Sequence, residues 1–309
     1  MSLYEHFTKV GPSGFGYGST AEQVTEGLSL AGKTFLVTGC NSGLGLETMR
    51  VLALRGARVV GTARTEAKAR EADARVTGGE VVPVACELAD APSIHRCIEA
   101  VKAHGFALDA IVCNAGIMAL PKLEKAYGYE LQFITNHVGH FMLVNGLLDQ
   151  LTDTGRVVML SSDAHKRAPR GGIDFDNLDG SRGYSSFGAY GRSKIANILF
   201  ALELSNRLRG TKRTANSLHP GVIDTNLARN MNPLVGAFYA VAGPLALKSI
   251  PQGAATQVFV ATHPSLEGVS GKYFSNCNVA RPRRDGTDEA TAKKLWTVTE
   301  EIVAKLPRE

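Results

Sequence analysis

Short, nearly continuous apolar runs recur along the chain, and segments with a helical pattern separate them. The runs predict strands over residues 33–38, 58–63, 80–86, 108–113, 156–161 and 214–218, with a further candidate over 271–274. The main predicted helices follow Gly45 and then cover residues 93–104, 131–151 and 189–209. Strands that are apolar on both faces and alternate with helices form a parallel sheet covered on both sides. The sequence therefore predicts an α/β fold: one doubly wound domain with a parallel six- or seven-stranded sheet.

Length and composition agree with one large folded domain. The 309 residues are 44% hydrophobic, which excludes a disordered or low-complexity chain. Five widely spaced cysteines form no C-x-x-C pair, so we predict neither a metal site nor a disulfide framework. Free cysteines in apolar runs indicate a reducing compartment, and we expect a cytoplasmic protein. The basic residues cluster tightly only at 281–284, so no nucleic-acid partner is expected.

No segment has the pattern of a membrane anchor. The first 30 residues lack an apolar core of signal-peptide length. The apolar stretch 234–247 contains Gly and Pro and is shorter than the ~20 residues of a spanning helix. We therefore expect no integral membrane segment, and we assign residues 1–30 to an N-terminal extension.

Three glycines, Gly39, Gly43 and Gly45, lie between the first predicted strand and its helix. At such a junction, N–H groups at a helix N-terminus bind the pyrophosphate of a dinucleotide, and a side chain would block its approach. The spacing is G-x-x-x-G-x-G rather than the usual G-x-G-x-x-G. The strand before and the helix after favour a Rossmann-type dinucleotide site over a plain tight turn.

Arg64 stands at the tip of the second predicted strand. An NAD site usually has an acidic residue there, which accepts from the ribose 2′-OH. A guanidinium would instead pair with a 2′-phosphate. The sequence therefore favours NADP(H) over NAD(H), with a solvated arginine at a strand end as the alternative.

Tyr190 and Lys194 are four residues apart on a predicted helix and share one face. An ammonium beside a phenol favours the phenolate, so we expect Lys194 to lower the pKa of Tyr190 from ~10 toward neutrality. Such a phenol can give or take a proton while a hydride moves at carbon.

Six motifs in order resemble the short-chain dehydrogenase/reductase family, over roughly residues 31–280. They are the glycine turn at 38–45, Asn114-Ala115-Gly116, Asn136 within 136–141, Ser161-Ser162, Tyr190 with Lys194, and Pro220-Gly221 with Thr225. Segments 136–141, 172–178 and 271–274 resemble the retinol dehydrogenase branch. The lead-in 18–27 resembles that of WW-domain-containing oxidoreductases and of chloroplast translocon-associated dehydrogenases.

The resemblance implies roles for four catalytic residues. Tyr190 would be the proton donor or acceptor, Lys194 would depress its pKa and bind the nicotinamide ribose, Ser162 would hold the substrate oxygen, and Asn136 would position a water. The implied cofactor-binding residues are Gly39, Asn41, Ser42, Gly43, Leu44, Gly45, Arg64, Glu87, Leu88, Asn114, Ala115, Gly116, Tyr190, Lys194, Pro220, Gly221, Val222 and Thr225. Taken one at a time, these residues also have purely structural interpretations. Ser162 could be a strand-end hydroxyl bonded to the backbone, Asn136 an amide inside a helix, and Thr225 a helix N-cap.

Some residues near these motifs differ from the family pattern or have no part in it. Glu87-Leu88 stands where the family usually has Asp-Leu, and the longer carboxylate is expected to accept from the adenine amino group. His137 and His140 are expected to be packing residues. Cys40 lies in the glycine turn, where a lowered thiol pKa is the less favoured alternative to an inert buried thiol.

The predicted function follows from these features. We expect one short-chain dehydrogenase/reductase domain over 31–309, with a flap at about 226–251 that is either an apolar substrate wall or a packing helix. It would transfer hydride between NADP(H) and a small hydrophobic carbonyl or alcohol substrate, as a homo-oligomer. The alternatives are a C=C reductase on the same fold and a non-catalytic protein that senses the cofactor or binds a partner.

Overall fold

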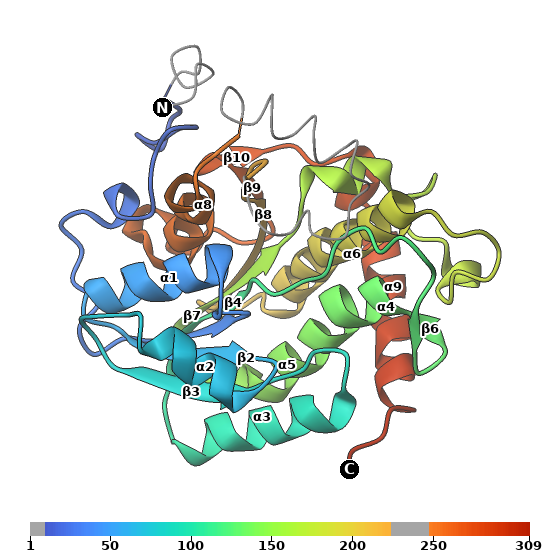
Figure 1. Cartoon of the computed structure of the whole chain (residues 1–309). Coiled ribbons are helices and arrows are strands. Elements are labelled where there is room, and N and C mark those ends of the chain that lie inside the picture. The colour runs from blue at the N-terminus through green and yellow to red at the C-terminus, as the bar shows by residue number, and fades with distance from the viewer. Residues whose placement is uncertain (1–9, 224–246) are drawn as a thin grey trace.

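The computed structural model describes residues 10–223 and 247–309. Its centre is a sheet of eight strands within those residues, in the order β10-β9-β8-β7-β4-β1-β2-β3 (Figure 1). They are β1 (Thr34–Thr38), β2 (Arg58–Ala63), β3 (Val81–Ala85), β4 (Leu108–Cys113), β7 (Leu151–Leu160), β8 (Thr214–His219), β9 (Tyr273–Ser275) and β10 (Asn278–Ala280). Neighbours are parallel except β9 and β10, which pair antiparallel. The predicted doubly wound α/β fold is confirmed, with an antiparallel strand added at one edge.

Helices cover both faces of this sheet (Figure 1). One layer contains α1 (Gly43–Leu54) and α8 (Ile250–Thr262), and the other contains α3 (Ala91–Ala103), α5 (Gly139–Leu147) and α6 (Ser186–Arg207). Successive side chains of a strand point to opposite faces. Accordingly, Phe35 and Val37 of β1 join the apolar cluster of α1 and α8, while Leu36 joins that of α3, α5 and α6.

The remaining elements lie at the margins. They include α2 (Glu66–Asp73), α9 (Glu289–Val303), which packs on α6, and the small hairpin of β5 (Lys125–Ala126) and β6 (Tyr129–Glu130). β3 is an edge strand and contains Pro83, which has no N–H to donate to a further neighbour. The edge position therefore tolerates a proline that a central strand would not.

The predicted single helix over 131–151 is several elements in the structure. It begins as α4 (Leu131–Phe133), widens into a π-helix over Ile134–Val138, and continues as α5 and a 3-10 turn over Leu148–Gln150. β7 begins at Leu151, five residues earlier than expected. The π-helix inserts one residue per turn and is typical of functional sites. Asn136 lies at its centre.

The N-terminal segment packs onto the domain. The Ala21 amide donates to the Pro251 carbonyl at 2.9 Å, and Ala21, Val24 and Leu30 join the apolar cluster of α1 and α8. Asn278 of β10 accepts from the Ser13 amide at 3.0 Å and donates to a neighbouring carbonyl of the same segment. The division at residue 31 stays a prediction, but the described part of the segment before it packs onto the domain.

The order of the strands locates the ligand cleft. β1 pairs with β2 on one side and with β4 on the other. Strands up to β3 are therefore added on one side of β1, and strands from β4 onward are added on the other side. In open α/β sheets, ligands bind outside the carboxyl ends of the strands at this switch point. Among the described helices, none is long and apolar enough to cross a membrane.

Candidate active site

The glycine turn joins β1 to α1 at this cleft. Gly39 and Gly43 have φ of +69° and +56°, which favour glycine, and a Cβ on Gly45 would lie 2.1 Å from the Gly39 carbonyl oxygen. Ser42 is the N-cap of α1, and no hydrogen bond from a described side chain caps the helix there. The first N–H groups of α1 therefore stay available for an anion. Asn41 and Leu44 lie in the same turn, as expected.

Asn114, Ala115 and Gly116 form the floor of the cleft after β4. Asn114 Nδ2 donates to the Thr38 carbonyl at 2.8 Å, and the Ala115 amide donates to Thr38 Oγ1 at 2.9 Å. A Cβ on Gly116 would lie 3.0 Å from Asn136 Oδ1 and 3.4 Å from Lys194 Nζ. The structure thus brings this floor against two of the predicted catalytic residues.

Arg64 and Glu87 meet at the tips of β2 and β3. Arg64 Nε lies 3.4 Å from Glu87 Oε2, and the Arg64 side chain is 64% exposed. Glu87 Oε1 also accepts from the Ala89 amide at 3.1 Å. The sequence assigned these residues to different parts of the cofactor, whereas the structure pairs them. Leu88 is buried and packs closely against Gly139: a Cβ on Gly139 would lie only 2.3 Å from the Leu88 carbonyl oxygen. Leu88 is therefore part of the packed wall of the cleft.

Tyr190 and Ser162 converge at the end of β7. The Tyr190 side chain is buried, and its hydroxyl lies close enough to the Ser162 side chain for Ser162 to affect its pKa. Burial raises the pKa of Tyr190 to about 12, and the Ser162 side chain partly offsets this increase. Ser162 Oγ also accepts from the Ala164 amide at 3.2 Å, so the strand-end role considered from the sequence is present too.

Lys194 lies one turn after Tyr190 on α6, but it does not have the predicted effect. Its Nζ is 5.6 Å from the Tyr190 ring centroid and donates to the Leu160 carbonyl at 3.2 Å. Burial lowers the pKa of Lys194 to about 8. The expectation that the ammonium pulls the phenol pKa toward neutrality is therefore wrong for this structure, because desolvation dominates at both groups.

Asn136 is completely buried in the π-helix, between the floor and α6. Its Oδ1 accepts from the Ile117 amide at 2.8 Å, and its Nδ2 donates to the Ile117 carbonyl at 2.9 Å. Nδ2 also donates to Ser193 Oγ at 2.9 Å, and Ser193 Oγ donates to the Tyr190 carbonyl at 2.8 Å. Asn136 thus ties the floor to the helix that carries Tyr190 and Lys194.

The loop after β8 closes this side of the site. Gly221 has φ of +105°, and a Cβ there would lie 2.6 Å from Lys248 Cδ. Pro220 precedes it, and Val222 is exposed. Thr225 and most of the predicted flap at 226–251 lie outside the described residues.

Two buried polar residues near the cleft were missed from the sequence. Gln257 of α8 contacts Thr48 and lies 3.3 Å from both the Leu44 carbonyl and Asn114 Oδ1, so it braces the glycine turn. Lys248 is 1% exposed, and its Nζ has no hydrogen-bond partner among the described residues. Neither residue belongs to a recognisable motif, and only the fold brings them to the cleft.

Cys40 has no reactive character in the structure. It is completely buried beside Gly61, and burial raises the pKa of its thiol to about 12. A thiol that stays protonated is a poor nucleophile. The structure therefore excludes the less favoured alternative of a lowered pKa for the Cys40 thiol.

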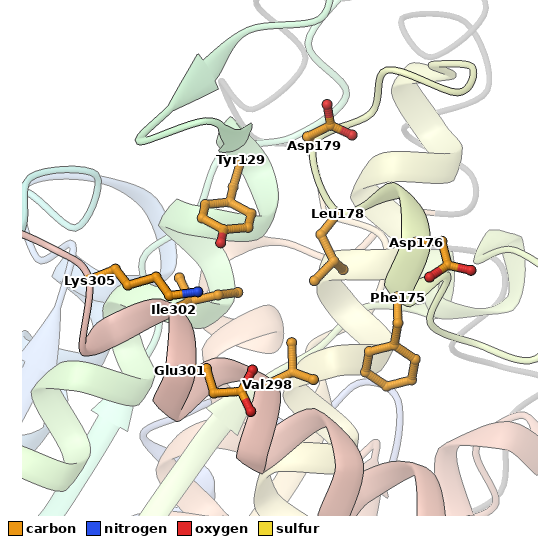
Figure 2. Close-up of a pocket in the computed structure, with 9 residues that line it drawn as sticks. All are labelled: Tyr129, Phe175, Asp176, Leu178, Asp179, Val298, Glu301, Ile302 and Lys305. Atoms are coloured by element: carbon orange, nitrogen blue, oxygen red, sulfur yellow. The ribbon is translucent and has the colours of Figure 1, made fainter.

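A separate cavity lies away from the cleft (Figure 2). It has a volume of about 280 Å³ and an apolar wall formed by Phe175, Leu178, Val298 and Ile302, with Tyr129 opposite. Asp176, Asp179, Glu301 and Lys305 also line it. No predicted site residue lines this cavity, so it does not serve the chemistry of Tyr190.

Comparison with known proteins agrees with this geometry. The short chain dehydrogenase family model matches residues 33–175. Short-chain dehydrogenase TIC 32 B, chloroplastic, from Brassica napus is 40% identical over 99% of this chain and 100% of its own length. Human retinol dehydrogenase 14 is 38% identical over 89% of this chain and 87% of its own length. The crystal structure of an uncharacterized protein from Mycobacterium paratuberculosis has 32% identity and a TM-score of 0.72, over 92% of this chain and 97% of that one. The chain belongs to the short-chain dehydrogenase/reductase family and is a dehydrogenase of that family.

Proposed function

We propose that the protein is an NADP(H)-dependent oxidoreductase that transfers hydride between the nicotinamide and a hydrophobic carbonyl or alcohol. The observation that carries this proposal is the position of Tyr190 beside Ser162 at the end of β7, in a cleft whose glycine turn leaves the N-terminus of α1 uncapped by a side chain. It places a proton donor beside a second hydroxyl that can hold a substrate oxygen.

The residues of the cleft fit a dinucleotide. The glycine turn leaves the N-terminus of α1 open to a pyrophosphate, and Gly116 leaves room beside Asn136 and Lys194. The exposed guanidinium of Arg64 would receive a 2′-phosphate, in competition with Glu87. When bound, the nicotinamide supplies or accepts the hydride.

Tyr190 would supply the proton for carbonyl reduction. With a pKa of about 12, its hydroxyl is protonated at neutral pH and ready to act as an acid. Ser162 would hold the oxygen on which charge develops. Lys194, with a pKa of about 8, lies next to both the floor and Tyr190 and would hold the nicotinamide ribose.

The relatives support a hydrophobic substrate. The name of human retinol dehydrogenase 14 describes an enzyme that acts on retinol, a hydrophobic alcohol. Transfer of that substrate class to this chain is part of the proposal, and so is the predicted substrate flap. A cytoplasmic location and a homo-oligomeric state remain predictions from the sequence.

The test is turnover by the purified protein with NADPH and a panel of hydrophobic aldehydes and ketones. We expect NADPH consumption with formation of the alcohol, and Tyr190→Phe should reduce kcat by at least about 100-fold. Tyr127→Phe removes a surface hydroxyl that bonds Asp90 and serves as the matched control. Turnover of no substrate, or full activity of Tyr190→Phe, would refute the proposal. A product reduced at C=C would favour the alternative reaction.

A further inference from the structure

The imidazole of His140 lies completely buried in the first turn of α5. Its Nε2 is 2.9 Å from Thr38 Oγ1 at the end of β1, and its Nδ1 is 3.0 Å from the Asn136 carbonyl oxygen. Thr38 leads directly into the glycine turn, and Asn136 lies at the centre of the π-helix. One side chain therefore contacts both the strand that leads to the phosphate site and the element that carries a predicted catalytic amide.

The partners of His140 fix the position of each proton. A carbonyl oxygen only accepts, so the contact with Asn136 requires a hydrogen on Nδ1. Burial lowers the pKa of His140 to about 4, so the ring is neutral at pH 7 and Nε2 carries a lone pair. That lone pair accepts from the Thr38 hydroxyl, whose oxygen accepts from the Ala115 amide at 2.9 Å. The hydrogen bonds run in one direction, from Ala115 through Thr38 and His140 to the Asn136 carbonyl.

This chain connects the two sides of the cleft. At one end, Thr38 and Ala115 belong to the wall and floor on which the dinucleotide would lie. At the other end, the Asn136 side chain is held by Ile117 and by Ser193 of the helix that carries Tyr190. His140 thus adds a second connection between the strand before the glycine turn and the π-helix, besides the bonds of the Asn136 side chain to Ile117.

We propose that His140 is a positioning residue, an Nδ1-protonated imidazole that orients Asn136 relative to the cofactor floor through Thr38. The inference rests on the proposed dinucleotide-dependent function for its effect on catalysis. Its structural part, the single tautomer and the coupling to Thr38, does not depend on turnover.

His137 provides the contrast expected of a packing histidine. Its ring lies among the aromatic rings of Phe133, Phe141 and Phe200. Its Nε2 contacts Thr299 Oγ1 of α9 at 3.0 Å. It is equally buried and lies in the same helical run, but its contacts face away from the cleft. His137→Phe is therefore a matched control for the general cost of altering this helix.

The tautomer is tested by nitrogen-15 NMR of the histidine-labelled protein, with the His140 signal assigned by its loss in His140→Asn. We expect a protonated Nδ1 and an unprotonated Nε2, with no titration between pH 8 and pH 5.5. A proton on Nε2 of the neutral ring, or an imidazolium at pH 7, would overturn the inference.

Substitutions separate the two contacts. Asn145 donates from Nδ2 to the Phe141 carbonyl one turn back at 2.8 Å, so an asparagine at 140 can donate to the Asn136 carbonyl in the same way. His140→Asn should keep kcat within about 2-fold and raise the Kd for NADPH by about 2- to 10-fold, because only the bond to Thr38 is lost. His140→Phe loses both bonds and should also reduce kcat by about 10-fold or more.

Coupling to Thr38 is tested with a double-mutant cycle. Thr38→Val and His140→Asn both remove the hydrogen bond between Thr38 Oγ1 and His140 Nε2, and Thr38→Val also removes the acceptor of the Ala115 amide. Because the first bond can be lost only once, their effects on the NADPH Kd should be less than additive. Both Kd and tautomer are measured without substrate, so they remain informative if no substrate is turned over. Full additivity, or a His140→Phe protein with the Kd and kcat of the wild type, would refute the proposal. Should His140→Phe fail to fold, the cycle and the NMR measurement decide.

Discussion

The guanidinium of Arg64 and the carboxylate of Glu87 form an ion pair across the tips of β2 and β3, with 3.4 Å between Nε and Oε2. Arg64 is the residue expected to bind a 2′-phosphate, and Glu87 neutralises part of its charge. Under the proposed function, this pair would set how strongly the protein prefers NADP(H) over NAD(H).

Removing the carboxylate should strengthen that preference. Glu87→Gln is expected to lower the NADPH Kd by about 2- to 5-fold with little change for NADH, because an exposed ion pair contributes up to about 1 kcal/mol. Arg64→Ala should raise the NADPH Kd by about 10-fold or more. Fluorescence titration with both cofactors measures the two constants. Arg70→Ala, which breaks an exposed pair within α2, is the control, and equal shifts for NADPH and NADH would contradict the assignment.

Burial of the charged Lys194 side chain should lower the free energy of unfolding at neutral pH. Its pKa falls from 10.5 to about 8, so between these values the unfolded chain binds more protons than the folded protein. The contribution of Lys194 to the free energy of unfolding therefore rises with pH through this window. Lys194→Met should be more stable than the wild type below pH 8, and the difference should shrink toward pH 10.5, with kcat reduced by at least about 100-fold.

Chemical denaturation at a series of pH values measures this difference. Lys33→Met, at an exposed lysine that pairs weakly with Asp109 at 3.9 Å, is a control that should show no such pH dependence. A Lys194→Met protein that is less stable than the wild type at pH 7 would show that the ammonium stabilises the fold.

Two glycines of the same turn should respond differently to one added carbon. Gly45→Ala places Cβ 2.1 Å from the Gly39 carbonyl oxygen, whereas Gly43→Ala places it in open space at a φ of +56°. We expect Gly45→Ala to abolish NADPH binding and to destabilise the protein by several kcal/mol. Gly43→Ala should cost about 1–2 kcal/mol. Urea denaturation with cofactor titration distinguishes them, and similar losses for both would be inconsistent with this geometry.

Trp296 should anchor α9 to the domain. Its ring is stacked on Phe200 at 5.5 Å and meets Phe141 edge to face at 4.8 Å. Trp296→Ala should reduce the free energy of unfolding by about 3–5 kcal/mol, while Trp296→Phe should retain most of it. Urea denaturation followed by circular dichroism measures both. If the two variants lose the same stability, the aromatic packing is not what holds the helix.

Local sequence patterns were sufficient to predict the central strands and the order of the site motifs along the chain. The runs at 58–63 and 108–113 have the bounds of β2 and β4, because a strand buried on both faces must be apolar throughout. The glycine turn and the Tyr190–Lys194 spacing likewise required no tertiary information.

Features that depend on tertiary contacts were not predictable. The π-helix around Asn136 has the same apolar pattern as an ordinary helix. The pairing of Arg64 with Glu87 depends on the register of β2 against β3. The pKa of Tyr190 depends on how deeply the ring is buried, which spacing to Lys194 does not reveal. His140 has the composition of a packing residue, and only its partners distinguish it from His137.

The narrow space at Gly116 has an evolutionary consequence. A methyl group there would press on Asn136 Oδ1 and on Lys194 Nζ, while the backbone of the floor would need no special conformation to accept it. A Gly116→Ala change would therefore act first on the positions of Asn136 and Lys194 rather than on the backbone of the floor. Under the proposed function, a descendant that keeps the dinucleotide site but loses turnover is a small evolutionary distance from this sequence.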